Sequence, residues 1–326
     1  MEHILVIGHG YIGNVHGAVS PLPAQYLVRH VPKENEIFFT DFESAVKNRP
    51  LFADICTPNH THDDFCRRAL AEGLPVYCEK PLTGKFESAA ALCRVAAKTD
   101  LPTTVAFNYR FLPNVQMLRN MLKEQKIGNI LYYKASFLHD SYVLPRPKSW
   151  KTEAAGGGAM TDLGIHILDL CTHIFGSGHV TECQKKTFFP QRTESNEYAR
   201  LTINHETFDG YLEISRVSAG KSAQSGIEVF GDKGSLTLFF DQPRDLLWYD
   251  MHDTHIFHPT SELLSFLHYP AAREDIGMFY GTHRASLYAF YNWVKTGQRH
   301  PLSATFSQAL EAERLLWEAF SLPENR

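Results

Sequence analysis

The stretch Ile4-Leu5-Val6-Ile7-Gly8-His9-Gly10-Tyr11-Ile12-Gly13 decides the fold of this chain. Its four leading apolar residues predict a buried strand, and its glycines have the spacing GxGxxG at the start of a predicted helix. In this frame the first glycine permits a tight turn, the second lets the backbone approach a pyrophosphate, and the third lets helix and strand pack closely. The N-terminus of the helix then faces the anion. We therefore expect a dinucleotide-binding loop formed by Gly8, His9, Gly10, Tyr11, Ile12 and Gly13.

Short apolar runs and helical patterns alternate over the first third of the chain. Continuous apolar strands that alternate with helices are typical of an α/β fold, with a parallel sheet covered on both faces. The predicted strands are Ile4–Ile7, Tyr26–Val28, Leu51–Cys56, Val76–Cys78 and Thr103–Phe107. The predicted helices are Tyr11–Val19, Thr61–Gly73, Phe86–Lys98 and Pro113–Lys126.

The pattern changes after Gly128. Parallel-type alternation does not recur, so we expect an open, mainly antiparallel second sheet, followed by helices at the C-terminal end. We assign residues 1–127 to a dinucleotide-binding domain and residues 128–326 to a second domain that binds the substrate. The predicted strands are Ile130–Phe137, Ala199–Ile203, Tyr211–Val217, Ile227–Phe230 and Leu236–Phe240. The predicted helices are Ala159–Phe175, which Gly176 ends, Leu287–Val294 and Ala309–Phe320.

Composition and charge argue against several classes of protein. The 326 residues are 44% hydrophobic and 21% charged, which allows a sizeable core. A net charge of −4 gives no electrostatic basis for binding nucleic acid or an anionic membrane surface. The first residues lack the pattern of a signal peptide, and no apolar stretch reaches the roughly 20 residues of a membrane helix. The six cysteines lack CxxC spacing, which favours buried thiols in a reducing compartment. We expect a cytoplasmic protein.

The end of the second predicted strand bears on the identity of the cofactor. An acidic residue at this point would bind the ribose 2′-hydroxyl of NAD. The strand instead ends at Val28-Arg29-His30, and cations suit the 2′-phosphate of NADP better. Glu34 and Glu36 lie close by in the sequence. Both cofactors therefore stay open, with Arg29 and His30 favouring NADP.

The segment Cys78-Glu79-Lys80-Pro81 directly follows the fourth predicted strand. In an open α/β sheet, ligands bind beyond the carboxyl ends of the strands. A lysine beside a nicotinamide can lower the pKa of a substrate hydroxyl or polarise a carbonyl group. From its position alone, an ordinary charged loop is an equal alternative.

Gly156-Gly157-Gly158 precedes a predicted helix with a stripe of Asp and His, which is typical of a site wall rather than a solvated face. His166 is the candidate general base or acid because the pKa of histidine lies near neutrality, and Asp162 would orient it or hold a substrate hydroxyl. A zinc or manganese site is the alternative, but four ligands over three helical turns cannot all meet one ion. The stripe consists of Asp162, His166, Asp169 and His173. A second cluster, expected at the surface without a metal, consists of His252, Asp253, His255 and His258.

Together these motifs resemble the Gfo/Idh/MocA family, the glucose–fructose oxidoreductase and inositol dehydrogenase group, over nearly the whole chain. Thr57-Pro58-Asn59 followed by His62 is similar to the family's loop on the nicotinamide side of the cofactor. Glu79-Lys80-Pro81 is similar to its catalytic EKP tripeptide, usually with a cis bond before the proline. Asn108-Tyr109-Arg110 resembles the segment that lines the site.

Two further segments carry the resemblance. The triple glycine and the helix with Asp162, His166 and Asp169 resemble the family's GGG…DxGxH..D helix. Gly231-Asp232-Lys233-Gly234-Ser235 matches a turn common in the family's second sheet. The resemblance implies a Rossmann domain followed by an α/β domain, whose open sheet would form the interface of a homodimer or homotetramer.

The resemblance also implies an NAD(P)-dependent oxidoreductase that moves a hydride between the nicotinamide and a hydroxyl-bearing carbon of a sugar, polyol or related substrate. Lys80, Asp162 and His166 would be the catalytic set, in which His166 takes the hydroxyl proton and Lys80 stabilises the developing alkoxide. The expected cofactor-binding residues are Gly8, His9, Gly10, Tyr11, Ile12, Gly13, Arg29, His30, Thr57, Pro58, Asn59, His62, Glu79, Lys80, Pro81 and Asn108. The expected substrate-binding residues are Lys80, Tyr109, Arg110, Trp150, Asp162 and His166.

Two other functions fit the same residues. Redox-assisted cleavage of glycosides, which some family members perform, would use the same catalytic set. A non-catalytic, cofactor-binding regulator on this fold would be expected to lose Lys80 or His166, and both are present. Tyr109 and Trp150 either stack on a sugar face or serve only in packing.

Overall fold

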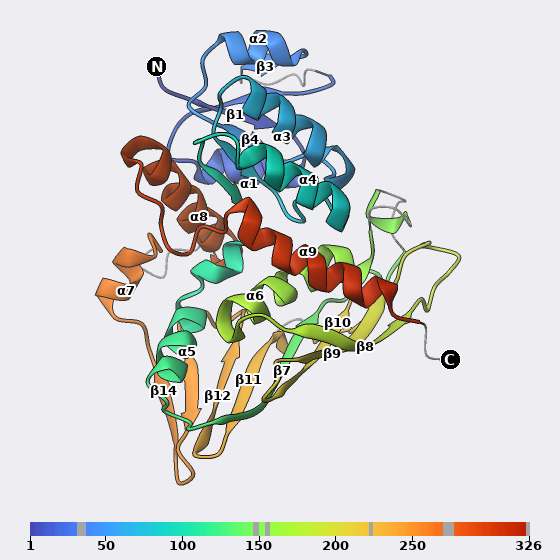
Figure 1. Cartoon of the computed structure of the whole chain (residues 1–326), viewed down its shortest axis with the longest axis vertical. Coiled ribbons are helices and arrows are strands. Elements are labelled where there is room, and N and C mark those ends of the chain that lie inside the picture. Colours follow the sequence, from blue (N-terminus) through green and yellow to red (C-terminus); the bar gives the residue numbers. More distant parts are fainter. Residues whose placement is uncertain (31–36, 146–149, 154–156, 222–223, 270–276, 324–326) are drawn as a thin grey trace. The chain divides into compact units, whose positions relative to one another are not determined.

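The computed structural model describes residues 1–30, 37–145, 150–153, 157–221, 224–269 and 277–323 (Figure 1). The chain divides into two compact units, Met1–Asn108 with Leu267–Leu310 and Tyr109–Phe266 with Glu311–Arg326. The expected functional assignment of 1–127 and 128–326 stays a prediction. The compact units differ from it because helix α5 (Pro113–Lys123) belongs to the second unit and helix α8 (Gly277–Thr296) to the first.

A six-stranded parallel sheet forms the centre of the first unit, as the alternating pattern predicted. Its strand order, β3-β2-β1-β4-β5-β6, reverses direction between β1 and β4, which places a ligand crevice at their carboxyl ends. The strands are β1 (Ile4–Ile7), β2 (Ala24–Leu27), β3 (Phe38–Phe39), β4 (Ala53–Ile55), β5 (Val76–Cys78) and β6 (Thr103–Val105). Its helices besides α8 are α1 (Tyr11–Val19), α2 (Phe42–Lys47), α3 (His62–Ala71) and α4 (Phe86–Ala96).

Helix α8 completes the core of the first unit, although it is distant in sequence from the strands. The ring of Phe290 on α8 lies 5.1 Å from that of Phe52 and 5.5 Å from that of Tyr77. All three side chains are fully buried. Removing a side chain of this size from water contributes roughly 1.5–3 kcal/mol. Helix α8 therefore contributes to the hydrophobic core of the first unit.

An eight-stranded sheet forms the second unit, in the order β14-β13-β12-β11-β7-β10-β9-β8. The sheet is mainly antiparallel, as predicted, with one exception: β7 and β10 run parallel. Parallel neighbours require a long crossover, and the chain between these two strands includes helix α6 (Ile165–Phe175). The strands are β7 (Ile130–Leu138), β8 (His179–Lys186), β9 (Tyr198–Asn204), β10 (Asp209–Ser215), β11 (Gly226–Gly231), β12 (Gly234–Phe239), β13 (Leu246–Tyr249) and β14 (Thr254–Phe257). The remaining helices are α7 (Ser261–Phe266) and α9 (Phe306–Ser321), and α9 spans the division between the units.

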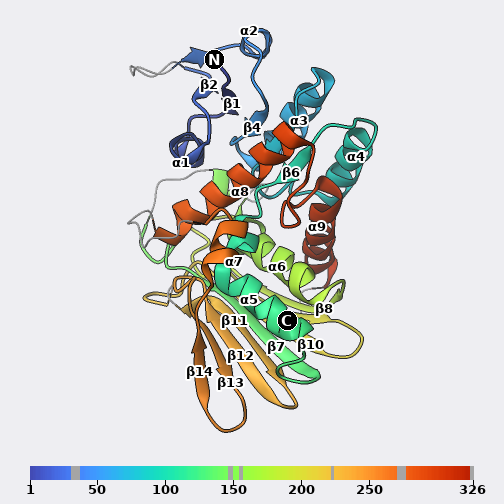
Figure 2. The same ribbon diagram turned by 90° about the vertical axis from the view of Figure 1, so that its left-hand side faces the viewer.

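The two faces of this second sheet differ. Helices α5 and α6 lie against one face (Figure 2). On β7, Tyr133 and Ala135 are buried on that side, whereas Tyr132 and Lys134 alternate onto the other. There the ring of Tyr132 stacks 4.6 Å from that of Phe230, and Tyr211 is 47% exposed. The second face therefore presents aromatic rings to its surroundings.

All six cysteines are buried free thiols, and the expected reducing compartment stays a prediction. Within the described residues, no helix combines the length and the hydrophobicity that crossing a membrane requires.

Candidate active site

Gly8 and Gly13 shape the turn between β1 and α1. The φ angle of Gly8 is +107°, which L-residues rarely adopt, and a Cβ there would lie 2.9 Å from the carbonyl oxygen of Cys56. A Cβ on Gly13 would collide with the carbonyl oxygen of Gly8. Gly10, at the N-cap of α1, has open space where its Cβ would stand. An anion can therefore approach the first turn of α1, as a pyrophosphate-binding loop requires.

The side chains of this loop have different surroundings. The ring of His9 packs edge-on against Tyr26 and Phe38, with centroids 4.7 and 5.2 Å away. Ile12 packs against the core of the unit, whereas Tyr11 is 73% exposed. Tyr11 is therefore the aromatic side chain that this loop offers to a ligand.

Arg29 and His30 follow the carboxyl end of β2, and both are exposed. In a dinucleotide-binding fold of this type, residues at this position bind the adenosine ribose. Glu34 and Glu36, the acidic alternatives, lie outside the described residues. The structure thus leaves the side chains of Arg29 and His30 accessible at this position, and their role in cofactor binding stays a prediction.

His62 connects two of the predicted cofactor segments. Its Nε2 lies 2.8 Å from the carbonyl oxygen of Thr57, and its Nδ1 lies 2.8 Å from that of Pro81. The ring is buried, and burial lowers its pKa against the opposing effect of these carbonyl groups. Asn59, between the two contacts in the chain, is buried as well. His62 therefore ties the loop of Thr57 to the loop of Pro81.

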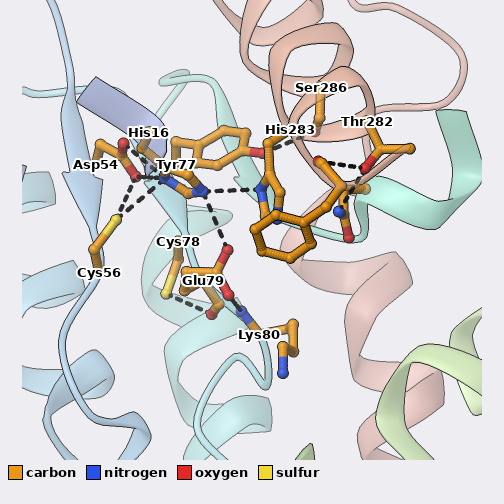
Figure 3. A network of polar contacts seen from close by, with 12 residues as sticks. His16, Asp54, Cys56, Tyr77, Cys78, Glu79, Lys80, Thr282, His283 and Ser286 are labelled. Carbon is orange, nitrogen blue, oxygen red and sulfur yellow. Dashed lines mark hydrogen bonds and ion pairs between the residues drawn. The ribbon is translucent and has the colours of Figure 1, made fainter. Parts of the chain in front are cut away.

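Lys80 directly follows β5 and is partly exposed (Figure 3). The bond between Lys80 and Pro81 is cis, as the resemblance implied. The backbone N–H of Glu79 donates to the carbonyl oxygen of Ile55 at 2.9 Å, which continues the pairing of β5 with β4. Because β1 and β5 are parallel strands of one sheet, the glycine loop and Lys80 leave the same edge.

Asn108 ends the first segment of this unit. Its Nδ2 donates to Oγ1 of Thr282 on α8 at 2.9 Å. Within the described residues its Oδ1 is a buried acceptor without a hydrogen-bond donor. The predicted cofactor role of Asn108 stays a prediction.

In the second unit, the helix predicted from Ala159 to Phe175 begins differently. Residues Met160–Gly164 form a π-helical turn, and the α-helix α6 continues over Ile165–Phe175 and is ended by Gly176, where φ is +88°. The prediction of one regular α-helix over Ala159–Phe175 was therefore wrong for the turn Met160–Gly164. Such turns are rare and occur frequently at functional sites.

Asp162 lies within this turn and has two cationic partners. It forms an ion pair with the guanidinium of Arg216, which follows β10, and lies 3.2 Å from Nζ of Lys151. Arg216 is buried, donates to Oγ of Ser141 at 2.9 Å, and lies 4.8 Å above the ring of Tyr142. The carboxylate of Asp162 is thus held from one side by a buried guanidinium and from another by a half-exposed ammonium.

His166 and Tyr109 are brought together, as the assignment of both to one site predicted. Their ring centroids lie 4.9 Å apart, and both residues are largely buried. The ring of Tyr109 also contacts Phe137 at 5.4 Å and Phe240 at 5.1 Å. Burial raises the pKa of the Tyr109 hydroxyl, which therefore stays protonated.

The other two residues of the stripe, Asp169 and His173, have contacts that suit a structural role. Asp169 forms a buried ion pair with Arg110, and burial lowers the pKa of His173 to about 2, assisted by the charges of Arg110, Arg119 and Lys123. His173 is therefore neutral. The guanidinium of Arg110 is engaged by Asp169, so its expected contact with substrate stays a prediction that this pairing does not favour.

Three further sequence predictions concern loops. Trp150 begins a short 3-10 helix, Trp150–Thr152, but its side chain, like Gly156, lies outside the described residues. In the second His/Asp cluster, Asp250 accepts hydrogen bonds from the backbone of His252 and Asp253 and from the ring of His255, at 2.9–3.0 Å. These side chains hold the turn between β13 and β14.

Sequence reasoning missed several residues around the candidate catalytic groups. Asp54 carried a signal, because a carboxylate within the apolar run of β4 requires a buried partner. His16, three residues after Gly13, is that partner. The contacts of His283 and Arg216 depend on folding and left no local pattern in the sequence.

The chain matches known protein families over most of its length. Residues 3–107 match the oxidoreductase family with an NAD-binding Rossmann fold, and residues 115–237 match the GFO/IDH/MocA C-terminal domain. Levoglucosan dehydrogenase of Pseudarthrobacter phenanthrenivorans is 27% identical, with 74% of each chain covered. Glucose-6-phosphate 3-dehydrogenase of Bacillus subtilis is 27% identical, with 72% of this chain and 73% of the relative covered.

A solved structure supports the same fold. Levoglucosan dehydrogenase in complex with NADH and levoglucosan superposes with a TM-score of 0.86 at 21% identity, over 98% of this chain and 96% of the other. The glycine loop, the EKP tripeptide, the DxGxH helix and both matched domains therefore lead to one conclusion. The chain belongs to the Gfo/Idh/MocA family of oxidoreductases.

Proposed function

We propose that this protein is an NAD(P)-dependent dehydrogenase that acts on a secondary hydroxyl group of a cyclic sugar or polyol. The observation that carries the proposal is the placement of Lys80 and the Gly8–Gly13 loop at one edge of the parallel sheet. A dinucleotide bound at this loop would extend along the carboxyl ends of the strands, where a lysine can act on the reacting oxygen.

The substrate class follows from the relatives. Levoglucosan, glucose 6-phosphate, glucosides and inositol are the substrates in the names of matching dehydrogenases. All of these are rings that carry several hydroxyl groups. The cluster of Asp162, His166 and Tyr109 in the second unit offers a carboxylate, an imidazole and an aromatic ring, which suit a ring hydroxyl and the apolar face of a sugar.

The proposed roles follow the chemistry of each group. When bound, the nicotinamide accepts or supplies the hydride. His166 takes the proton of the reacting hydroxyl, and the ammonium of Lys80 stabilises the negative charge that develops on its oxygen. Asp162, held by Arg216 and Lys151, orients the substrate hydroxyl or His166.

The proposed cofactor preference is for NADP. Arg29 and His30 are exposed after β2, where a cation can bind the 2′-phosphate. Replacing both residues by alanine is expected to weaken NADPH binding and to leave NADH binding nearly unchanged. Equal loss for both cofactors would assign these side chains to the pyrophosphate or to folding instead.

We also propose a cytoplasmic homodimer or homotetramer that associates through the second sheet. The face of this sheet that carries Tyr132, Tyr211 and Phe230 exposes aromatic rings that association would bury. Light scattering of the wild-type protein and of a Tyr211→Lys variant tests this proposal. A monomeric wild-type protein would refute it.

Fluorescence titrations with NADH and NADPH test the function first, followed by a panel of sugars and polyols with the preferred cofactor. Micromolar binding and substrate-dependent reduction of the nicotinamide are expected. Turnover of a glycoside without net consumption of cofactor would show redox-assisted cleavage instead. Binding of cofactor with no turnover of any substrate would favour a regulator, and binding of neither cofactor would refute the oxidoreductase assignment.

A further inference from the structure

A series of connected, buried ionisable side chains leads to Lys80 in the first unit (Figure 3). Asp54 comes from β4, His16 from α1, Glu79 from the end of β5 and His283 from α8. Each of the four is less than one-tenth exposed. Burying this many ionisable groups costs free energy unless each of them is paired with another polar group.

The Asp54 side of the series fixes one proton of His16. Nδ1 of His16 lies 3.1 and 3.0 Å from the two carboxylate oxygens of Asp54. The Sγ atom of Cys56 lies 3.1 Å from the same nitrogen and donates to Asp54 at 3.3 Å. A carboxylate only accepts hydrogen bonds, so Nδ1 carries the proton and donates it.

The other nitrogen of His16 faces a second carboxylate. Nε2 lies 3.3 Å from Oε1 of Glu79 and 3.0 Å from Nδ1 of His283. Burial favours a neutral ring for His16, but Asp54 and Cys56 raise its pKa well above the ordinary value. Burial, together with the charge of His16, lowers the pKa of His283 to about 3. His16 is thus an imidazolium, with Asp54 on one side, and neutral His283 and Glu79 on the other.

Glu79 connects this imidazolium to the loop that carries Lys80. Burial opposes ionisation of Glu79, but its ion pair with His16 and the positive charges of His16 and Lys80 lower its pKa to about 2. Its Oε2 accepts a hydrogen bond from the backbone N–H of Lys80 at 3.3 Å. The carboxylate is therefore attached to the start of the loop and also supplies a negative charge beside the Lys80 side chain.

We propose, on the basis of the proposed role of Lys80, that Glu79 is a positioning residue for the reaction and that His16 and Asp54 hold it in place. The charges alternate along the series: Asp54 is negative, His16 positive, Glu79 negative and Lys80 positive. The arrangement holds the backbone at Lys80 and places an anion beside its side chain. Within the first unit, Glu79 and His283 each interact electrostatically with Lys80.

This arrangement makes a prediction about pH dependence. If Lys80 acts as an ammonium, activity falls as the pH rises through the pKa of Lys80. An adjacent anion favours the charged form of a lysine, so removal of the Glu79 charge lowers that pKa. The Glu79→Gln variant is expected to move the alkaline limb of the kcat/KM profile to lower pH by about one unit.

The kinetic test compares Glu79→Gln with Glu79→Asp, His16→Gln and Asp54→Asn. Glu79→Gln is expected to lower kcat roughly 10- to 100-fold while the dissociation constant of the cofactor changes less than about threefold. Glu79→Asp keeps the charge and should restore the alkaline limb to its wild-type position. Tyr77→Phe is the matched control, because it removes a buried hydroxyl bonded to Ser286 at 2.8 Å without changing a charge. If kcat falls in all variants, Tyr77→Phe included, and the alkaline limb of the kcat/KM profile does not shift, Glu79 has only a structural role. That result would overturn the proposal.

A spectroscopic test is independent of turnover and of variants that fail to fold. Two-bond ¹H–¹⁵N spectra of the wild-type protein report the protonation of both ring nitrogens of His16. The His16 signals are identified by sequential assignment or by their disappearance in His16→Gln. Both nitrogens are expected to be protonated at mildly alkaline pH. A neutral His16 would overturn the proposal even if Lys80 proved catalytic, whereas a normal kcat in Lys80→Met would refute the role of Lys80 itself.

A bound metal ion is the alternative outcome. Nε2 of His16, a carboxylate oxygen of Glu79 and Nδ1 of His283 lie within 4.8 Å of one another, close enough to share a divalent cation. Elemental analysis of the purified protein distinguishes the two cases. Stoichiometric zinc that disappears in His283→Gln would replace the imidazolium by a metal centre and overturn the proposal, and metal-free active protein supports it.

Discussion

Arg110 and Asp169 form a buried two-point ion pair, in which Nε lies 2.8 Å from Oδ2 and Nη2 lies 2.5 Å from Oδ1. Both side chains are less than 5% exposed. Burial nevertheless leaves the pKa of Asp169 above its ordinary value, against the lowering effect of Arg110. The pair therefore offsets the cost of its own burial only in part, as is common for ion pairs in protein interiors.

The single variants Arg110→Met and Asp169→Leu should each lower the free energy of unfolding by about 3–5 kcal/mol, because each leaves one buried charge without its partner. The double variant should recover most of this loss. Urea denaturation of all four proteins measures the difference. Additive losses in the double variant would mean that the two residues stabilise the protein through other contacts.

Substitutions in the glycine loop should separate cofactor binding from folding. Gly10→Ala has space for the new methyl group, so the free energy of unfolding should change by less than about 0.5 kcal/mol. The methyl group occupies the approach to the pyrophosphate, and cofactor affinity should fall about tenfold or more. Gly13→Ala is the matched comparison, since its methyl group collides with backbone, and it should cost about 1–3 kcal/mol of stability. Thermal denaturation and fluorescence titration read the two effects separately.

The two partners of Asp162 should differ in importance. Arg216 is buried, so Arg216→Met leaves a buried carboxylate poorly compensated and should cost about 3 kcal/mol or more. Lys151 is 44% exposed, and Lys151→Met should cost less than about 1 kcal/mol. A larger effect on stability from Lys151→Met than from Arg216→Met would contradict this ranking.

Acid unfolding should report the ionisation of Glu79. Its pKa is lowered from 4.5 to about 2 in the folded protein, so the stability that it contributes is present above pH 4.5 and is lost as the pH falls toward 2. The difference in free energy of unfolding between the wild-type protein and Glu79→Gln should therefore shrink over this interval. A constant difference from pH 5 to pH 2 would show that folding does not lower the pKa of Glu79.

Much of the fold could be predicted from local sequence patterns. The apolar runs of β1, β4 and β5 are buried on both faces, so composition alone indicated a parallel sheet. The edge strands β8 and β14 were not predicted, because a sheet edge tolerates polar and exposed residues. Strand β8, for example, buries only Val180 and Cys183.

The candidate site was predictable where chemistry follows a motif. The position of Lys80 after β5 could be expected from the sequence, and Tyr109 and His166, each assigned to the substrate site, are in contact in the structure. The partners of these groups could not be expected, since His16 and His283 are 267 residues apart and meet only in the folded unit. The π-helical turn at Asp162 also has no signature of its own, because its residues are compatible with an ordinary helix.

The discontinuity of the first unit has a consequence for biosynthesis. The parallel sheet is complete in the nascent chain once β6 has emerged from the ribosome, but α8, which buries Phe52 and Tyr77, is still untranslated. At roughly 5–20 residues per second, the intervening segment takes on the order of ten seconds or more to synthesise. During this time the apolar flank of the sheet lacks Phe290 and His16 lacks His283. A chain that ends before α8 should therefore expose the apolar surface around Phe52 and Tyr77.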